Sequence, residues 1–213
     1  MARRSFDLSL YLVTDEPLTA GRSLEHIVRQ AIEGGVTAVQ LREKTASTRE
    51  LLEQARWMRR LTRDAGVCLI VNDRIDVALA VDADGVHVGQ SDMPVDTARE
   101  LLGDERVLGV TAANSAEAEQ ARRHGADYVG SSAVFATPTK TDTGPPIGLR
   151  GLSELVRAVQ LPVVAIGGIK ADNAGEVIQA GAAGVAVVSA IVAADDPRAA
   201  AAELSTIVKQ ARR

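Results

Sequence analysis

The sequence contains few aromatic residues and a single cysteine. Aromatic side chains make up 2% of the 213 residues, whereas hydrophobic residues as a whole reach 46%. The core must therefore be built mainly from Ala, Val, Leu and Ile. Cys68 lies in the apolar run VCLIV, so a disulfide framework is excluded and a buried thiol is expected.

Long hydrophobic runs and a surplus of basic residues are also missing. No run reaches the roughly 18 apolar residues of a membrane span. The start, MARRSFDLSLYLV, lacks the apolar stretch and cleavage signal of a secretory leader. The formal net charge of −4 argues against a nucleic-acid-binding protein. We therefore expect a cytoplasmic protein with neither nucleic-acid nor membrane partners, although a local cationic pocket is compatible with this charge.

Short β-branched segments alternate with longer helical patterns along the whole chain. Apolar residues at positions 24, 27, 28, 31 and 32, for example, have the spacing of an amphipathic helix. Eight strand–helix units predict a parallel sheet covered on both faces. We therefore expect a single α/β domain over residues 1–213, a (β/α)8 TIM barrel. A doubly wound open sheet is the alternative. The expected strands are 9–15, 37–43, 67–73, 85–89, 106–112, 127–135, 162–169 and 184–191.

Local signals mark where the helices begin and where one connection is unusual. Ser47 with Glu50, and Asn173 with Glu176, have the spacing of a capping box. The segment 136–148, ATPTKTDTGPPIG, is longer than an ordinary connection between a strand and a helix. Loops of this length are often functional lids.

Polar side chains gather at the expected carboxyl ends of the strands, where sites form in barrels of this kind. If QLREK is extended, Gln40, Arg42 and Lys44 share one face, since alternate residues of a strand do so. Each residue alone has an ordinary explanation, because Asp, Asn and Gly commonly form turns and caps. Their joint occurrence indicates a site. The other members of this rim are Glu43, Asn72, Asp73, Gln90, Asp92, Thr111, Thr137, Thr139 and Lys140.

The charges of this rim favour a diphosphate held with a divalent cation. Three cations (Arg42, Lys44 and Lys140) and two carboxylates (Asp73 and Asp92) leave a net charge of +1. Two carboxylates that face one cavity repel each other unless a cation joins them. Mg²⁺ is typically held by one or two carboxylates and substrate phosphates. With Mg²⁺ the rim carries about +3, which matches a diphosphate.

A second anion site is expected on the other side of the rim. Phosphate sites in these barrels frequently use the loops after the seventh and eighth strands. There, Gly167 and Gly168 let a ligand approach the backbone closely, and Val188 and Ser189 offer an amide and a hydroxyl. A tight turn is the ordinary explanation for the two glycines. The three histidines receive no role, and His87 in the fourth strand is interpreted as a hydrogen-bonded core histidine.

The motifs YLVTD, QLREK, VNDRIDVALAVDADGVHVGQSDMP, TPTK, AIGGI and VVSAI resemble the thiamine-phosphate synthase family in order and spacing, over residues 9–192. The resemblance implies a (β/α)8 barrel and a transferase of thiamine biosynthesis. Such an enzyme joins 4-amino-2-methyl-5-hydroxymethylpyrimidine diphosphate to 4-methyl-5-(2-phosphoethyl)thiazole by a dissociative, Mg²⁺-assisted substitution, giving thiamine phosphate and pyrophosphate.

The same resemblance implies roles for individual residues. Asp73 and Asp92 would bind Mg²⁺. Catalysis would fall to Arg42, Lys44, Lys140 and Thr111. The pyrimidine diphosphate would be bound by Gln40, Leu41, Arg42, Glu43, Lys44, Asn72, Thr111 and Lys140. The thiazole phosphate would be bound by Thr137, Pro138, Thr139, Gly168, Val188 and Ser189.

Two features depart from the family pattern. Thr111 stands where the family commonly has Ser, which keeps the hydroxyl and adds a methyl group to the pyrimidine pocket. The stretch GSSAVF replaces the usual Gly-Pro version before the long loop. Two other functions are the alternatives: a thiazole tautomerase, which would not need the diphosphate and metal rim, and a non-catalytic module that binds a phosphorylated ligand. The sequence leaves a monomer and a homo-oligomer both open.

Overall fold

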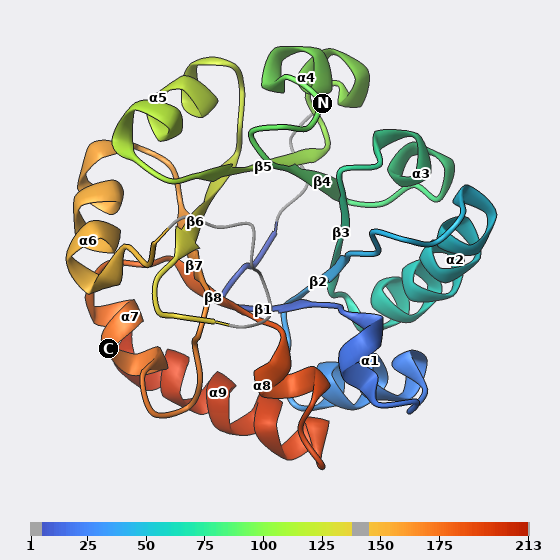
Figure 1. The fold of residues 1–213 in the computed structure, drawn as a ribbon. Helices are drawn as coiled ribbons and strands as arrows, with labels where there is room; N and C mark the ends of the chain where they lie inside the picture. The colour runs from blue at the N-terminus through green and yellow to red at the C-terminus, as the bar shows by residue number, and fades with distance from the viewer. Residues whose placement is uncertain (1–5, 138–144, 213) are drawn as a thin grey trace.

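The strands form a closed parallel barrel (Figure 1), which confirms the predicted fold class. The computed structural model describes residues 6–137 and 145–212, so Pro138, Thr139 and Lys140 lie outside the described residues. Each strand pairs with the next along the chain, and the last pairs with the first. All eight expected strands are present: β1 (Leu10–Val13), β2 (Ala38–Leu41), β3 (Cys68–Asn72), β4 (Gly85–Val88), β5 (Val107–Ala112), β6 (Tyr128–Ala133), β7 (Val163–Ile166) and β8 (Gly184–Val187).

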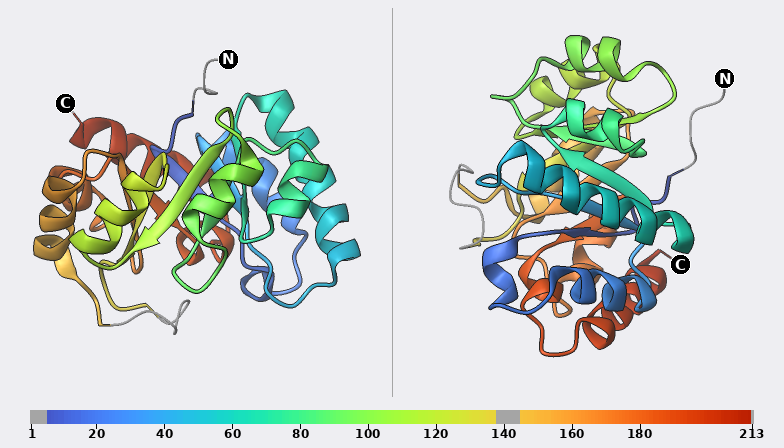
Figure 2. Two further views of the ribbon diagram at one scale, coloured as in Figure 1. Left: turned by 90° about the horizontal axis from the view of Figure 1, so that it is seen from above. Right: turned by 90° about the vertical axis from the view of Figure 1, so that its right-hand side faces the viewer.

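Helices surround the barrel on its outside, as two further views show (Figure 2). The last and longest of the C-terminal helices, α9, packs against α1 and α7 and so closes the ring between the two ends of the chain. Within the described ranges, no helix is long and apolar enough to cross a membrane. The helices are η1 (Glu16–Thr19), α1 (Leu24–Glu33), α2 (Thr48–Ala65), α3 (Ile75–Ala80), α4 (Val95–Leu102), α5 (Ser115–Arg123), α6 (Gly148–Ala158), α7 (Ala174–Gln179), α8 (Ser189–Val192) and α9 (Pro197–Ala211).

Several strands end earlier than the sequence predicts, and this changes the position of site residues. β2 ends at Leu41, so Arg42 and Lys44 lie in the loop beyond it and not on an extended face. β8 ends at Val187, so Val188 and Ser189 lie outside the strand. Val188 is the N-cap of α8 and Ser189 its first residue. The β-branched side chain of Val188 favours a strand, but the backbone must turn into the helix here, and tertiary context overrides the local preference.

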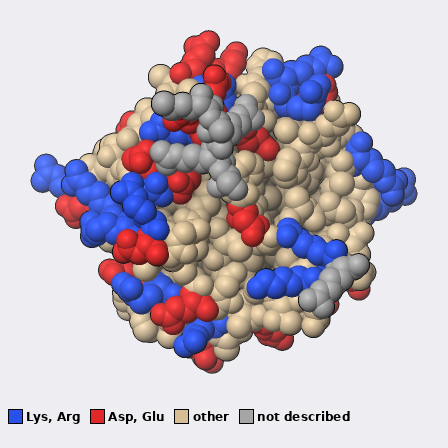
Figure 3. Space-filling model, turned by 180° about the vertical axis from the view of Figure 1, so that it is seen from behind, with Lys and Arg blue, Asp and Glu red and all other residues tan. Residues whose placement is uncertain are grey.

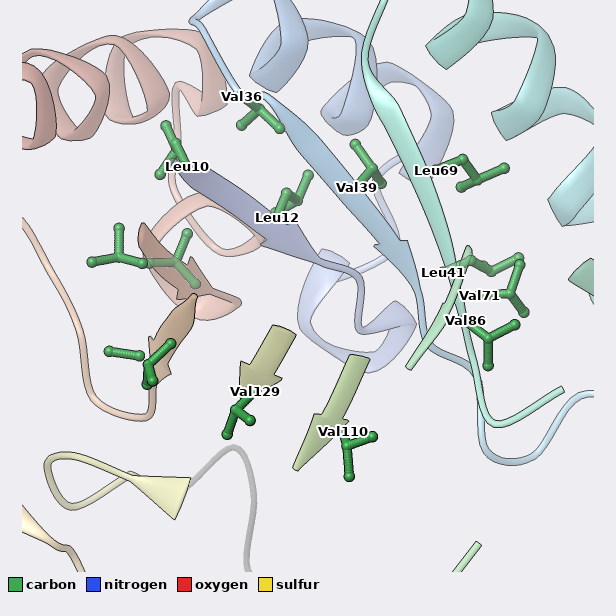
Figure 4. Packing of buried hydrophobic residues seen from close by; sticks show 14 of the residues in the cluster. Leu10, Leu12, Val36, Val39, Leu41, Leu69, Val71, Val86, Val110 and Val129 are labelled. Atoms are coloured by element: carbon green, nitrogen blue, oxygen red, sulfur yellow. The ribbon is translucent and has the colours of Figure 1, made fainter. Parts of the chain in front are cut away.

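The main core lies between the barrel and its helices. Leu12, Val39 and Leu69 stand on the outer faces of β1, β2 and β3 (Figure 4) and are fully buried. They belong to one cluster with Ala55 and Met58 of α2. Full burial of such an aliphatic side chain contributes roughly 1.5–3 kcal/mol. The aliphatic core that the composition predicts is therefore confirmed.

On the inner face of the barrel, the large polar rings of Tyr128 and His87 fit because glycines face them. A Cβ atom on Gly109 would lie 2.1 Å from Cζ of Tyr128, and one on Gly130 would lie 2.9 Å from Cε1 of His87. Both distances are shorter than atoms tolerate, so any larger residue would displace the rings. Since side chains of a strand alternate between its two faces, these inward positions form a set distinct from the outer core.

A partly buried aspartate, Asp84, and a buried one, Asp127, lie at the end of the barrel where the strands begin. Asp84, just before β4, accepts a hydrogen bond from an amide of β3 at 2.8 Å, and Asp127, just before β6, accepts one from an amide of β5 at 2.8 Å. Arg59 of α2 and Arg99 of α4 pair with these carboxylates at 2.7 and 2.6 Å. Figure 3 shows this end of the molecule, where basic and acidic side chains spread around a largely uncharged centre.

Candidate active site

A cavity of about 620 Å³ opens at the carboxyl ends of the strands. The loops after β2, β3, β4 and β5 line one side of it, and the loops after β6, β7 and β8 line the other. Described residues of both predicted anion sites therefore line one cavity. The predicted site residues in its wall are Gln40, Arg42, Lys44, Asn72, Asp73, Gln90, Asp92, Thr111, Thr137, Gly167, Gly168, Val188 and Ser189.

Two predicted site residues do not line this cavity. The side chain of Leu41 points to the outer core and is 1% exposed, because Leu41 and Gln40 are neighbours in β2 and face opposite sides. The carboxylate of Glu43 turns back onto its own loop, where it accepts hydrogen bonds from the amide and the hydroxyl of Thr45 at 2.9 and 3.0 Å. Glu43 thus shapes the loop that carries Arg42 and Lys44.

Each cation of this loop faces a carboxylate. The Nη1 atom of Arg42 lies 3.7 Å from Oδ2 of Asp15, and the Nζ atom of Lys44 lies 2.6 Å from Oδ2 of Asp73. The hydroxyl of Thr14 accepts a hydrogen bond from the Arg42 amide at 3.0 Å, which fixes the loop against the end of β1. The residues after β1 and β3 therefore hold both cations beside the cavity, where the side chain of Lys44 is half-exposed and that of Arg42 is mostly buried.

Asp73 and Asp92 form a pair of neighbouring acidic groups whose pKa values are shifted in opposite directions. Burial raises the pKa of Asp73, and the neighbouring Asp92 raises it further against the opposing effect of Lys44. Burial also acts to raise the pKa of Asp92, but hydrogen bonds from Asp73 and from the Gly89 amide outweigh it and hold this pKa below its usual value. As the pH rises, Asp92 therefore loses its proton before Asp73 does.

The backbone at Asp73 is arranged to bring its side chain to the cavity. Its φ of 59° lies in the left-handed region, which Asp tolerates better than most residues other than glycine. The Asp73 amide donates a hydrogen bond to the carbonyl of His87 at 2.9 Å. Such strain at the end of a strand persists only where the surroundings impose it, and it is common at functional sites.

The carboxylate pair suits a divalent cation of the Mg²⁺ type. Two such carboxylates repel each other unless a proton or a cation lies between them, and Mg²⁺ is usually held by one or two carboxylates, waters and substrate phosphates. Across residues 6–137 and 145–212, no group of three or more His, Cys, Asp or Glu side chains could hold a metal ion. Asp73 and Asp92 could therefore supply only part of a coordination shell.

The cavity wall is more acidic than the rim that the sequence predicts. Seven charged side chains of the described residues line it, three cationic and four acidic, which leaves a net charge of −1. The predicted +1 included Lys140, which lies outside the described residues, and did not include Glu117, Lys170 and Asp172. A polyanionic ligand would therefore depend on a divalent cation as well as on the loop cations.

The loops after β7 and β8 form the other side of the cavity. Gly167 and Gly168 have φ values of 95° and 65°, and a Cβ atom on Gly167 would lie 2.6 Å from Ala133. These glycines are thus required by the turn and by close packing against the end of β6. The predicted capping box at Asn173 is wrong, because its side chain instead donates to the Gly168 carbonyl at 3.0 Å and accepts from the Lys170 amide at 2.9 Å. The box at Ser47 is confirmed.

Five polar side chains form a hydrogen-bonded chain across the floor of the cavity. Nε2 of Gln40 donates to the Tyr11 hydroxyl at 2.8 Å, which lies 3.1 Å from the Tyr128 hydroxyl. Nδ1 of His87 lies 2.9 Å from the same Tyr128 hydroxyl, and its Nε2 lies 2.8 Å from Oγ1 of Thr111. Burial raises the pKa of both tyrosines well above the usual value, so both remain neutral hydroxyls.

Sequence reasoning missed three members of this chain: Tyr11, His87 and Tyr128. His87 is hydrogen-bonded, as predicted, but it lines the cavity and is not simply a core residue. The missing signal was the alternation along each strand. His87 stands two residues after the inward-facing Gly85 in β4 and pairs with Gly109 of β5, so it had to face the interior.

The sequence is similar to those of known proteins over most of its length. The chain matches the family model described as "Thiamine monophosphate synthase" over residues 10–191. It is 59% identical to a thiamine-phosphate synthase of Chloroflexus aurantiacus over 202 residues, which cover 95% of this chain and 93% of the relative. It is 54% identical to a thiamine-phosphate synthase of Moorella thermoacetica over 203 residues, 95% of this chain and 97% of the relative.

The fold is also that of a solved structure with similar sequence. A thiamine phosphate pyrophosphorylase from Pyrococcus furiosus superposes with a TM-score of 0.89 at 45% identity, covering 97% of this chain and 98% of that chain. A 3-hexulose-6-phosphate synthase superposes with a TM-score of 0.69 at 19% identity, which shows a common barrel alone. From its matching sequence over nearly the whole barrel, this chain belongs to the thiamine monophosphate synthase family of transferases.

Proposed function

We propose that this chain joins a hydroxymethylpyrimidine diphosphate to a thiazole phosphate and releases pyrophosphate. One observation carries the proposal. A single cavity holds a carboxylate pair with two loop cations on one side and the glycine turn and start of α8 on the other. Two phosphorylated substrates therefore have separate places for their phosphates, with their reacting carbon and nitrogen atoms between them. The names of the relatives agree with this reaction.

The diphosphate end of the pyrimidine lies against the loops after β2 and β3. Arg42 and Lys44 bind its oxygens, Arg42 through the paired N–H groups of its guanidinium. Asn72, at the end of β3, faces the same part of the cavity. Lys140 is proposed from the family motif to add a further cation. Mg²⁺ would be held by Asp73 and Asp92 and would neutralise charge on the departing diphosphate.

The phosphate of the thiazole lies on the opposite side. Thr137, Gly168 and Ser189 come from three different loops and line one part of the cavity. Phosphate sites of these barrels frequently lie between the loops after the seventh and eighth strands and a short extra helix, which here is α8. By the family motif, Pro138 and Thr139 complete this site together with Val188.

The reaction uses the positions of the substrates and needs no nucleophile from the protein. The bond from the methylene carbon to the diphosphate oxygen breaks, and its electron pair leaves with the diphosphate. The amino-substituted ring delocalises the positive charge on the methylene carbon. The thiazole nitrogen then donates its lone pair to that carbon, which completes the C–N bond. Cations beside the leaving group act where negative charge develops, and holding both substrates in line supplies much of the remaining acceleration.

The proposal assigns the whole reaction to one barrel. All proposed substrate-binding residues come from its loops and strands, so the single catalytic domain predicted over residues 1–213 suffices. A cytoplasmic location and assembly into a homo-oligomer stay predictions.

The test is an assay with purified protein, Mg²⁺, hydroxymethylpyrimidine diphosphate and thiazole phosphate. Thiamine phosphate and pyrophosphate should appear in equal amounts, and a chelator should abolish both. A control reaction with thiazole phosphate replaced by its dephosphorylated alcohol should be much slower. If well-folded protein yields neither product, the transferase is refuted. Conversion of a thiazole tautomer would then favour the tautomerase, and ligand binding without turnover would favour the binding module.

A further inference from the structure

The hydrogen-bonded chain on the floor of the cavity connects two proposed substrate-binding residues through three other side chains. Gln40 and Thr111 stand at its ends, and Tyr11, Tyr128 and His87 lie between them. Gln40, Tyr11 and Tyr128 are 5%, 2% and 0% exposed. The sequence has two tyrosines in all, and both belong to this chain.

The chain has a direction, because each tyrosine hydroxyl has one proton. Gln40 donates from Nε2 to Tyr11, so Tyr11 is left to donate to Tyr128, and Tyr128 to Nδ1 of His87. A neutral imidazole that accepts at Nδ1 donates from Nε2, here to Oγ1 of Thr111. The carboxamide oxygen and the second amide N–H of Gln40 are then left outside the chain, as is the hydroxyl proton of Thr111. The Gln40 end therefore offers an acceptor beside a donor, and the Thr111 end offers a donor.

The opposite direction would change both ends together. If the Gln40 carboxamide turned over, Tyr11 would donate to its oxygen, each following hydroxyl would reverse, and His87 would change tautomer. Thr111 would then donate into the chain, and the oxygen and N–H of Gln40 would have exchanged places. The orientation of the Gln40 carboxamide is therefore linked to the role of Thr111, and neither can change alone without leaving a buried polar atom unsatisfied, which is costly.

We propose that Tyr11, Tyr128 and His87 are positioning residues that fix which way the oxygen and the free N–H of the Gln40 carboxamide face, and thereby select an aminopyrimidine over the corresponding oxopyrimidine. An aminopyrimidine offers an N–H donor beside a ring-nitrogen acceptor, whereas an oxopyrimidine offers a carbonyl acceptor beside a ring N–H. The oxo form would therefore bind only if the entire chain reversed. This inference rests on the proposed function, since it assumes that the pyrimidine lies on this floor.

Calorimetric titration of the full-length protein tests the inference without relying on turnover. The two probes are the 4-amino and the 4-oxo forms of 2-methyl-5-hydroxymethylpyrimidine. Wild-type protein should bind the amino form about tenfold or more tightly than the oxo form, the equivalent of one good hydrogen bond. In Tyr128→Phe the ring stays but the chain is cut, so Gln40 can turn over independently and the ratio should fall several-fold toward one.

A second substitution separates a chain from two independent contacts. Tyr11→Phe should lower the ratio as Tyr128→Phe does, and the double variant should be no worse than either single variant, because a chain that is already cut cannot be cut again. Thr62→Val is the matched control. It removes a buried hydroxyl that bonds only within α2, to the Arg59 carbonyl at 3.3 Å, and should leave the ratio unchanged.

Two results would overturn the inference: an unchanged binding ratio in folded Tyr128→Phe, or losses in the double variant that multiply those of the single variants. Should Tyr128→Phe fail to fold, a comparison of His87→Gln with His87→Leu tests the same inference. The His87→Gln variant keeps an N–H toward Thr111 and should bind the amino form more tightly than the His87→Leu variant does. Equal binding would refute the role of His87. Absence of turnover in wild-type protein would count against the proposed function and not against the binding ratio.

Discussion

The Nζ atom of Lys44 lies 2.6 Å from Oδ2 of Asp73, so a proposed diphosphate ligand and a proposed metal ligand are paired with each other. Both groups must change partners when substrate and metal bind, because the lysine would turn to the diphosphate oxygens and the aspartate to the cation. The pair holds both side chains at the cavity before binding. It also makes Lys44 a competitor of the metal for Asp73.

Lys44→Gln should separate these two effects. Without substrate, removal of the competing ammonium should strengthen Mg²⁺ binding to the protein several-fold. In turnover, loss of a cation at the diphosphate should raise KM and lower kcat/KM by about tenfold to a hundredfold, since a charge-assisted hydrogen bond is worth roughly 1.5–3 kcal/mol. Magnesium titration by calorimetry and steady-state kinetics measure the two quantities. Weaker metal binding in the variant would contradict the competition.

Asp73→Asn should lose activity without losing stability. The pKa of Asp73 is raised above its ordinary 3.8, chiefly by burial. The protonated carboxyl therefore contributes to stability in full below about pH 3.8, and this contribution is lost as the pH rises through the raised pKa. At pH 7 the ionised carboxylate therefore destabilises the metal-free protein. Asparagine removes this charge and still tolerates the left-handed backbone. The melting temperature without metal should stay equal or rise by a few degrees.

The same variant should lose turnover by about 100-fold or more, because one of the two proposed metal ligands has gone. Wild-type protein should melt at a higher temperature when Mg²⁺ and diphosphate are added, and this increase should be largely absent from Asp73→Asn. Thermal unfolding with and without both ligands checks the claim. A variant that melts several degrees below metal-free wild type would show that Asp73 stabilises the fold instead.

The sequence was sufficient for the fold because the same pattern repeats eight times. Every predicted strand is present, yet ends such as that of β8 were placed too late, since Val188 looks like a strand residue and turns into a helix only because the barrel ends there. The start of α2 was predictable from a local signal. Ser47 and Glu50 form the capping box that their spacing predicts.

The site was predictable where residues follow a strand and harder to predict within the strands. Arg42, Lys44, Asp73 and Asp92 were expected at one rim, and they line one cavity. Tyr11 and His87 were not expected, because inside a strand an aromatic residue or a histidine is more often part of the core. Only the register between neighbouring strands shows that both face the same interior as Gln40, and register is a long-range property that a single sequence does not contain.

Asp127→Ala should destabilise the protein strongly although Asp127 does not line the cavity. Asp127 is 2% exposed in its side chain and pairs with Arg99, itself 12% exposed, at 2.6 Å. Its removal leaves a buried guanidinium without its carboxylate and an amide of β5 without its acceptor. Loss of one partner of a buried pair typically costs about 3–5 kcal/mol. Urea unfolding measures this loss, and KM of the remaining folded enzyme should not change.

An exposed ion pair in the same protein is the matched control. Arg29 and Glu25 lie one turn apart in α1, with 3.0 Å between Nη2 of Arg29 and Oε1 of Glu25. Both side chains are about half exposed. Glu25→Ala should therefore change the free energy of unfolding by no more than about 0.5 kcal/mol. Similar losses in Asp127→Ala and Glu25→Ala would show that burial of the first pair does not matter as argued.

Gly109→Ala should disturb the floor of the cavity from β5, the strand that pairs with β6 beside Tyr128. The added methyl group would lie 2.1 Å from Cζ of Tyr128, so the ring must move, and with it the hydroxyl that joins Tyr11 to His87. Overpacking of this kind typically costs about 1–3 kcal/mol. Because the displaced ring also breaks the chain, binding of the aminopyrimidine should weaken more than the stability loss alone explains. Gly175→Ala is the control, since its methyl group would lie 3.7 Å from Cγ2 of Ile207, an ordinary contact, and alanine in a helix is favoured by roughly 0.5–1 kcal/mol. Equal ligand binding by the two variants, measured by calorimetry on folded protein, would mean that the position of Tyr128 does not control the floor.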